Sequence, residues 1–309
     1  MARGSDSLRG RAAPATIAYP GSRASPIRRD LLPVIQAALG DRYTLHREIG
    51  RGGAARVFLA EDRAGNRVAL KVLHPELQVS VTAERFLREI KFASRIDHPL
   101  VARVLDSGEA DWLVYYVMPF IEGPTLRTHL DRVRRLPVDD VVRMGRDLLG
   151  ALGAAHRLGI VHRDVKPENI VLSANGAVLL DFGIARAIEA AGSGGLTRSG
   201  ITVGTSRYMS PEQVQGASDI DHRTDLYSLG CVLFEACTGQ PPFRHPNEVV
   251  VLQMHINDAP PDLRAHRPDA PDALAAAIGR ALVKERERRW QSADEMARAL
   301  EERPAEMNR

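Results

Sequence analysis

Cysteine, long apolar runs and an excess of one charge are all scarce in this sequence of 309 residues. The two cysteines, Cys231 and Cys237, lie close together in an apolar stretch and lack any CxxC or Cys/His ligand spacing. We therefore expect reduced thiols in the core of a cytoplasmic protein rather than a disulfide or a zinc site.

A membrane-spanning helix needs about 18 or more consecutive apolar residues, and no stretch of this sequence reaches that length. The longest candidate, residues 226–237, is interrupted by Ser228, Gly230 and Glu235, which favours a buried helix of a globular core. The N-terminus also lacks the apolar segment of a signal peptide. We therefore expect no membrane segment within this sequence and a cytoplasmic location.

The formal net charge is +3, and basic residues are interspersed with acids instead of forming one block. Nucleic acid is therefore not the expected partner. With 44% hydrophobic and 26% charged residues, the chain can bury the core of one large domain or two lobes.

The N-terminal 42 residues differ in composition from the rest. Residues 1–29 are rich in Arg, Ala, Ser, Gly and Pro and have almost no acids, which predicts a disordered basic extension. A transit peptide shares the Arg and Ser bias and is the alternative. A short helix is predicted at 31–39, ended by Gly40, and residues 303–309 are expected to form a tail.

Short apolar and alternating runs at 43–49, 56–61 and 67–73 predict three antiparallel strands. The turn between the first two contains Gly50, Gly52 and Gly53, and such glycines let backbone N–H groups approach phosphates. A glycine-rich hairpin alone is weak support. It gains weight because Val68-Ala69-Leu70-Lys71 follows on the third strand, where protein kinases place a phosphate-binding lysine.

The next periodic segment, 82–96, predicts a helix with Glu89 near its apolar face. An ion pair between Glu89 and Lys71 would aim the ammonium at the nucleotide phosphates, and movement of the helix would break it. The apolar run at 112–121 predicts a strand that leads into the connection between two lobes.

The strongest signal is His162-Arg163-Asp164-Val165-Lys166-Pro167-Glu168-Asn169, followed by Asp181-Phe182-Gly183. Each triplet alone could be a turn after a buried strand, but their order and spacing match two protein-kinase motifs. Asp164 could accept the proton of an attacking hydroxyl, and Lys166 could lie beside the transferred phosphoryl group. Asn169 and Asp181 could hold Mg²⁺.

Beyond these motifs the sequence predicts a mainly helical region. A long helix at 137–158 precedes the catalytic loop, residues 190–204 predict a mobile loop, and 204–212 close that loop. Thr224 is expected to cap a helix at 225–237 that Gly239 ends.

With these motifs in order over about 43–300, the chain resembles the bacterial eukaryotic-like serine/threonine protein kinases. The resemblance implies an α+β, two-lobed fold. The small lobe and hinge, 43–121, would hold a five-stranded antiparallel sheet and one helix. The large lobe, 122–302, would be mainly helical and contain the activation segment, 181–212.

The resemblance also implies ATP in the cleft with Mg²⁺, Mn²⁺ being an alternative, and protein substrates bearing Ser or Thr. It implies that the Pro119 carbonyl and the Ile121 N–H grip the adenine. It further implies apolar walls for the adenine pocket, formed by Ile49, Val57, Ala69, Met118 and Val171. Ala55 replaces the third glycine of the loop, so phosphate contacts there are expected to be looser.

Regulation and assembly are further expectations. Arg163 could pair with a phosphorylated residue of the mobile loop, and the spacing from Gly204 resembles the family's autophosphorylation positions at Thr197, with Ser199 or Thr202 second. The resemblance also implies an ion pair between Glu212 and Arg289. Family members often dimerise through the small lobe, which makes such a homodimer an open expectation.

Three alternatives remain. A pseudokinase would bind nucleotide without transfer, but every charged catalytic position is present. A small-molecule kinase of similar fold would lack the 204–212 peptide-docking segment. A nucleic-acid-binding protein is suggested only by the basic N-terminus and would show salt-dependent DNA binding by residues 1–42.

Overall fold

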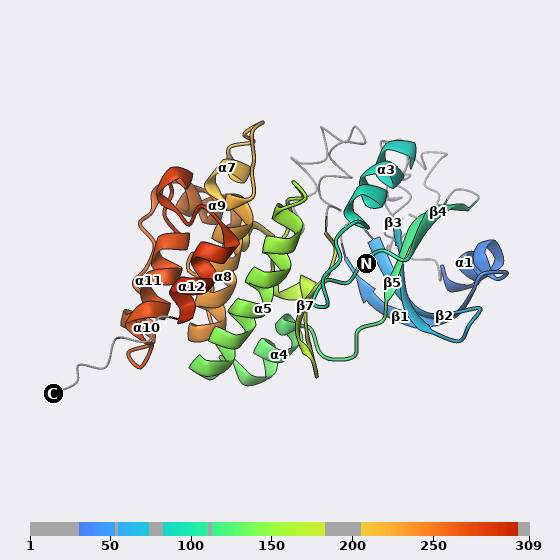
Figure 1. The fold of residues 1–309 in the computed structure, drawn as a ribbon, viewed down its shortest axis with the longest axis horizontal. Coiled ribbons are helices and arrows are strands. Elements are labelled where there is room, and N and C mark those ends of the chain that lie inside the picture. Colours follow the sequence, from blue (N-terminus) through green and yellow to red (C-terminus); the bar gives the residue numbers. More distant parts are fainter. Residues whose placement is uncertain (1–30, 53–54, 74–82, 111–112, 183–204, 302–309) are drawn as a thin grey trace, which may run out of the picture.

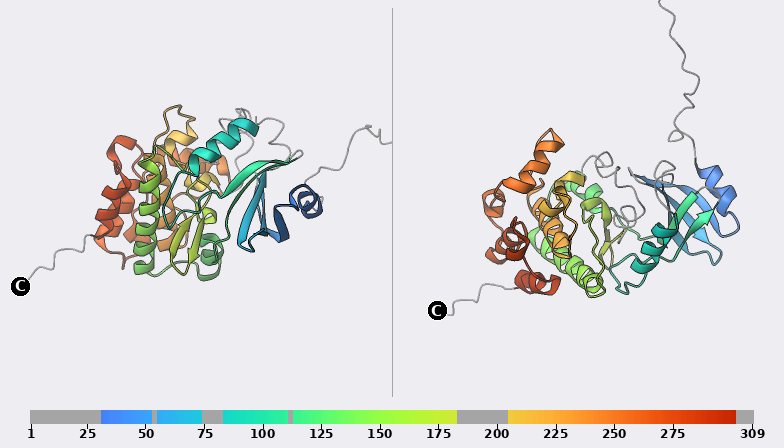
Figure 2. Two further views of the ribbon diagram at one scale, coloured as in Figure 1. Left: turned by 45° about the vertical axis from the view of Figure 1, so that its right-hand side comes forward. Right: turned by 90° about the horizontal axis from the view of Figure 1, so that it is seen from above.

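The computed structural model describes residues 31–52, 55–73, 83–110, 113–182 and 205–301. It has two lobes (Figure 1). One lobe is a sheet with a helix on each face, and the other lobe is mainly helical. The same division is visible in the turned views, where the sheet lies toward one end of the molecule and the helical body toward the other (Figure 2). This arrangement confirms the predicted two-lobed α+β fold.

The small lobe is built on one antiparallel sheet with the strand order β1-β2-β3-β5-β4. Its strands are β1 (Tyr43–Arg51), β2 (Ala55–Asp62), β3 (Arg67–Leu73), β4 (Asp106–Ala110) and β5 (Leu113–Pro119). Successive side chains of a strand point to opposite faces, so β1, β2, β3 and β5 contribute to two separate apolar layers. In β5, Tyr116 joins the layer facing the other lobe, whereas Tyr115 joins the outer layer.

A helix covers each face of the sheet. On the inner side, α3 (Ala83–Ala93) packs Phe86 and Ile90, both fully buried, against the sheet. On the outer side, α1 (Leu32–Leu39) buries Ile35 and Leu39 against the second layer. The helix predicted at 31–39 is therefore present as α1, but it packs in the small-lobe core, which thus begins before the predicted boundary at Tyr43.

Gln36 of α1 is bonded to the edge strand of the sheet. Its Oε1 accepts a hydrogen bond of 2.7 Å from the Leu45 N–H, and its Nε2 donates to the Tyr43 carbonyl at 3.1 Å. The side-chain amide therefore gives β1 the donor and acceptor that a neighbouring strand would offer.

The large lobe consists of helices and one two-stranded sheet. Its helices are α4 (Leu126–Val133), α5 (Val138–His156), α7 (Pro211–Val214), α8 (Arg223–Thr238), α9 (Glu248–Asn257), α10 (Leu263–His266), α11 (Asp272–Ala281) and α12 (Ala293–Glu301). The sheet pairs β6 (Ile170–Ser173) with β7 (Gly176–Leu179). Among the described residues, short 3₁₀ turns lie at Pro167–Asn169, Thr205–Tyr208 and Arg286–Arg288.

Helix α8 runs through the centre of this lobe and is buried from Thr224 to Cys237. A helix that is apolar on all sides is expected in a core position. Cys231 and Cys237 are free and buried there, and burial raises the pKa of the Cys237 thiol to about 12. This fits the expected reduced core thiols.

The predicted start of α8 is wrong, whereas its predicted end is confirmed. Thr224 lies inside the helix, and its hydroxyl hydrogen-bonds to Ser210 instead of capping the first turn. Gly239 ends the helix with φ 81°, a left-handed conformation that favours glycine. None of the helices among the described residues combines the length and apolar character needed to cross a membrane.

A buried ion pair joins the segment after the activation loop to the C-terminal part of the lobe. Arg289 is fully buried and donates two hydrogen bonds, of 2.7 and 2.8 Å, to the two carboxylate oxygens of Glu212. The expected pairing of these residues is therefore present. Such bidentate geometry fixes both side chains in one orientation.

Candidate active site

The buried carboxylate of Asp225 in α8 anchors the loop between α5 and β6. Its Oδ1 accepts from the Arg163 N–H, and its Oδ2 accepts from the His162 N–H and from His156 Nε2, each at 2.8 Å. Burial would raise the pKa of Asp225, but the hydrogen bond and charge of His156 hold it below its ordinary value. The ionised carboxylate therefore anchors the loop that carries Asp164.

Asp164, Lys166 and Asn169 meet at one carboxylate oxygen. Oδ2 of Asp164 lies 2.8 Å from Lys166 Nζ and accepts a 3.0 Å hydrogen bond from Asn169 Nδ2. The same Nδ2 also donates to the Asp164 carbonyl at 2.8 Å. These contacts fix the direction of the Asp164 carboxylate and bring the three predicted residues together.

Asp181 follows β7 and faces both lobes. Its backbone has φ 64°, which is uncommon for a residue other than glycine. Lys71 Nζ of β3 lies 2.6 Å from Oδ2, and the Tyr116 hydroxyl of β5 donates to Oδ1 at 2.7 Å. Burial would raise the pKa of Asp181, but Lys71 and the Tyr116 hydrogen bond hold it below its ordinary value.

The predicted ion pair between Lys71 and Glu89 is replaced in this conformation. Among the described residues, the ion pair of Lys71 is the one with Asp181, and none joins it to Glu89. The Asp181 carboxylate is only 10% exposed and close to the ammonium, so their attraction is little screened by water. A Lys71–Glu89 pair needs a different position of the lysine side chain, and the role of Glu89 stays a prediction.

The residues predicted to hold a metal have suitable donor atoms. Asn169 uses its Nδ2 for Asp164, so its Oδ1 is the side-chain atom that could bind a metal. Asp181 supplies a carboxylate. No group of three or more His, Cys, Asp or Glu residues that could bind a metal occurs in the part of the chain described. Mg²⁺ is usually held by one or two protein oxygens together with substrate phosphates, so this donor set fits it.

Most residues predicted to bind the nucleotide line the inner face of the small lobe. Ile49, Val57, Ala69 and Met118 belong to or pack against one apolar cluster, which Ile121 also contacts. Pro119 ends β5 opposite Val68. Val171 is buried in β6 of the large lobe.

The glycine-rich turn is secured at its base. The Gly52 N–H donates to the Ala55 carbonyl at 2.9 Å, closing the turn after Gly50. Arg51 and the buried Arg56 both hydrogen-bond to Glu48, which lowers the pKa of that carboxyl to about 2. Gly53 lies outside the described residues.

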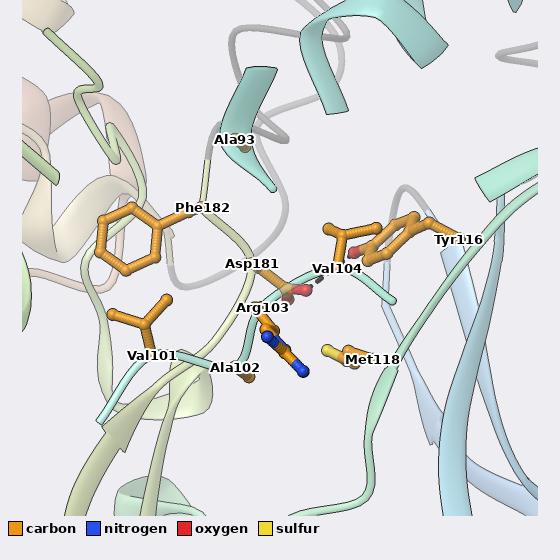
Figure 3. A pocket seen from close by; sticks show the side chains of 9 residues that line it. All are labelled: Ala93, Val101, Ala102, Arg103, Val104, Tyr116, Met118, Asp181 and Phe182. Atoms are coloured by element: carbon orange, nitrogen blue, oxygen red, sulfur yellow. Dashed lines mark hydrogen bonds between the residues drawn. The ribbon is translucent and has the colours of Figure 1, made fainter. Parts of the chain in front are cut away.

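A small cavity of about 10 Å³ lies between the lobes beside Asp181 (Figure 3). Room of that size suits roughly one water molecule. Its lining includes Tyr116 and Met118 from the small lobe and Asp181 and Phe182 from the large lobe. Phe182 is buried and packs edge-on against His162, with ring centroids 4.6 Å apart.

Two residues of this site were missed from the sequence. The sequence places Asp225 at the start of a predicted helix and Tyr116 in an apolar strand, and neither pattern assigns the side chain a contact. The predicted phosphorylation positions Thr197, Ser199 and Thr202 lie outside the described residues, so they stay predictions.

Comparison with known proteins agrees with the resemblance inferred from the sequence motifs. The family model described as protein kinase domain matches residues 43–299. The chain is 41% identical over 266 residues to a probable serine/threonine-protein kinase of Streptomyces coelicolor, covering 84% of this chain and 39% of that protein. It is 42% identical to the serine/threonine-protein kinase PknB of Mycobacterium leprae, covering 84% and 42% of the two chains.

A third relative, a probable serine/threonine-protein kinase PknB of Bifidobacterium longum, is 38% identical over 271 residues. The match covers 84% of this chain and 39% of that relative. The chain thus spans about two fifths of the length of the relatives it matches.

Proposed function

Because this chain belongs to the protein kinase family, we propose that it transfers the γ-phosphoryl group of ATP to Ser and Thr hydroxyls of proteins. The observation that carries the proposal is that two charged groups from separate parts of the sequence are joined: Lys71 contacts Asp181, and Leu180 beside Asp181 donates its N–H to the carbonyl of Asn169, whose side chain holds Asp164. Phosphoryl transfer depends chiefly on positioning and on neutralising charge, and this arrangement provides both.

Each residue has a role that follows from its contacts. Asp164, with its carboxylate direction fixed, accepts the proton of the substrate hydroxyl. Lys166, 2.8 Å from that carboxylate, neutralises charge on the transferred group. Lys71 moves from Asp181 to the nucleotide phosphates, and Glu89 then receives its ammonium.

Asn169 and Asp181 would hold Mg²⁺, with Mn²⁺ as the alternative ion. When bound, the ion neutralises the phosphate oxygens and orients the nucleotide. The glycine turn at Gly50, Gly52 and Gly53 covers the phosphates. The apolar cluster around Met118 encloses the adenine, whose edge meets the backbone of Pro119 and Ile121.

The test is the replacement Asp164→Asn, which keeps the shape of the side chain and removes the base. Loss of a general base typically lowers the rate by about 10²–10⁴-fold. We expect that loss in transfer of labelled phosphate from ATP to a protein such as casein. Asp139→Asn, an exposed position at the start of α5, should leave the rate unchanged. Equal activity of both variants would refute the assignment.

The same assay separates the alternatives. Labelled phosphoserine or phosphothreonine in the hydrolysed substrate supports a protein kinase, whereas nucleotide binding without transfer indicates a pseudokinase. Labelling only of small molecules such as aminoglycosides would indicate a small-molecule kinase.

Activation by autophosphorylation at Thr197, with Ser199 or Thr202 second, is part of the proposal. It is supported by the position of Arg163, whose N–H is bonded to Asp225 and whose carbonyl accepts from Gln213 Nε2 at 2.8 Å. Mass spectrometry of an active preparation after incubation with Mg-ATP should find phosphate there. An active but unmodified loop would refute it.

Location and assembly are also proposals. A cytoplasmic location is supported by the two buried, unbridged cysteines. A homodimer through the outer face of the small-lobe sheet would include α1, because that helix covers this face. Sedimentation of the wild-type chain tests the dimer.

A further inference from the structure

Tyr116 and Lys71 are neighbours on one face of the sheet and reach the same carboxylate. They lie directly opposite each other on the antiparallel strands β5 and β3, so their side chains project side by side. Lys71 Nζ donates to Oδ2 of Asp181. The Tyr116 hydroxyl donates to Oδ1 of the same carboxylate (Figure 3). A cation and a phenol of the small lobe thus hold an acidic residue of the large lobe.

Tyr116 and Lys71 differ in how readily they can break their contact with Asp181. Tyr116 is 1% exposed, and Phe86 of α3 packs near it with ring centroids 6.4 Å apart. A rigid, enclosed ring cannot withdraw, and a buried hydroxyl without a partner is costly. Lys71 is 16% exposed and carries its ammonium on a flexible four-carbon stem, so it can move to another acceptor.

The backbone of Asp181 adds a second constraint. Its φ of 64° fixes where the side chain leaves the chain, and the Tyr116 hydrogen bond then sets the rotation of the carboxylate. With Oδ1 on Tyr116, Oδ2 is the oxygen that can exchange Lys71 for another cation.

We propose that Tyr116 is a positioning residue for the metal ion, because it orients Asp181 so that Oδ2 faces the ion once Lys71 has left. This inference rests on the proposed function, since it assumes that Asp181 holds a metal with the nucleotide. Partners that orient metal ligands in this way typically affect metal affinity by about 10–100-fold.

The test measures binding of a fluorescent ATP analogue to the full chain, first in EDTA and then during a Mg²⁺ titration. The variant Tyr116→Phe removes only the hydroxyl. We expect the Mg²⁺ concentration that gives half of the maximal increase in analogue binding to rise by about 10-fold or more. The affinity for the analogue in EDTA should be unchanged. A purely structural role would weaken binding in both conditions.

The chain offers a matched control one residue away. Tyr115→Phe removes a hydroxyl from the same strand, but from the outer face of the sheet, where the ring lies against Arg42. This variant should titrate like the wild type. Tyr116→4-aminophenylalanine restores a donor to the same ring, and it should restore the wild-type titration even if the phenylalanine variant folds poorly.

Three outcomes would overturn the inference. An unchanged or lower Mg²⁺ requirement in Tyr116→Phe would show that the hydroxyl does not assist the metal. Failure of the aminophenylalanine variant to recover would show that hydrogen bonding is not the cause. If the wild type itself shows no Mg²⁺-dependent nucleotide binding, the proposed function fails as well, which distinguishes the two failures.

Discussion

Replacement of Asp225 by asparagine should both destabilise the large lobe and slow phosphoryl transfer. The wild-type carboxylate accepts three hydrogen bonds, two at Oδ2 and one at Oδ1. If the amide oxygen of Asn takes the Oδ2 position, its NH₂ group faces the Arg163 N–H, a donor against a donor. The variant therefore loses one bond to a charged acceptor and weakens two others.

The cost can be worked from those three contacts. A hydrogen bond to a charged group contributes about 1.5–3 kcal/mol, and the two remaining bonds weaken when the acceptor becomes neutral. We expect a total loss of about 3 kcal/mol in the free energy of unfolding. For a protein of this size, that corresponds to a decrease of roughly 6–12 °C in the melting temperature.

The assay combines thermal unfolding with kcat at saturating ATP and protein substrate. The loop carrying Asp164 is anchored through His162 and Arg163, so kcat should fall by about 10-fold or more. Asp139→Asn, at the surface, is the control for removing one negative charge. A melting temperature within about 2 °C of the wild type, together with unchanged kcat, would refute the reasoning.

Three other changes test different parts of the structure. Glu212→Gln leaves the buried Arg289 without a charged partner, and urea unfolding should show a loss of about 3–5 kcal/mol. Ile35→Ala, in the core beneath α1, should cost about 2–4 kcal/mol by the same measurement. Burial, followed by the charge of Lys284, lowers the pKa of His255 to about 3, so only the unfolded state takes up a proton as the pH falls through 6.5. Unfolding free energy should thus decrease by roughly 2 kcal/mol between pH 6.5 and pH 5, and His255→Asn should remove that part.

Each of these three predictions has a result that would contradict it. Stability of Glu212→Gln close to that of the wild type would mean that Arg289 finds other acceptors of equal value. An Ile35→Ala variant with unchanged unfolding would show that α1 does not stabilise the sheet. For His255, equal pH dependence in the wild type and the Asn variant would place the titration at other groups.

The two-lobed fold was implied by the resemblance to the kinase family, whereas individual strands, helices and central residues could be predicted from local patterns. Alternation of apolar residues located β3, and its lysine was identified by the neighbouring Val68-Ala69-Leu70. The spacing from Asp164 to Asn169 predicted a group that the structure brings within hydrogen-bond distance. Such short motifs fix the spacing of their own residues, so they can be recognised without information from the rest of the chain.

The missed features depend on contacts between distant segments. Tyr116 alternates correctly as an inward-facing strand residue, and nothing in that pattern says that its hydroxyl meets Asp181, 65 positions away. Asp225 anchors a loop about 60 positions earlier. The Lys71–Glu89 pair was expected from motif spacing, but the choice between two carboxylates depends on the conformation adopted.

The contact between Gln36 and β1 bears on how this kinase domain behaves in a crowded solution. An unpaired edge strand can recruit a strand from another molecule, which is a common start of aggregation. Here a glutamine side chain has already taken the Tyr43 carbonyl and the Leu45 N–H. Helix α1 therefore occupies two backbone groups of the edge strand β1 and disfavours self-association through that strand.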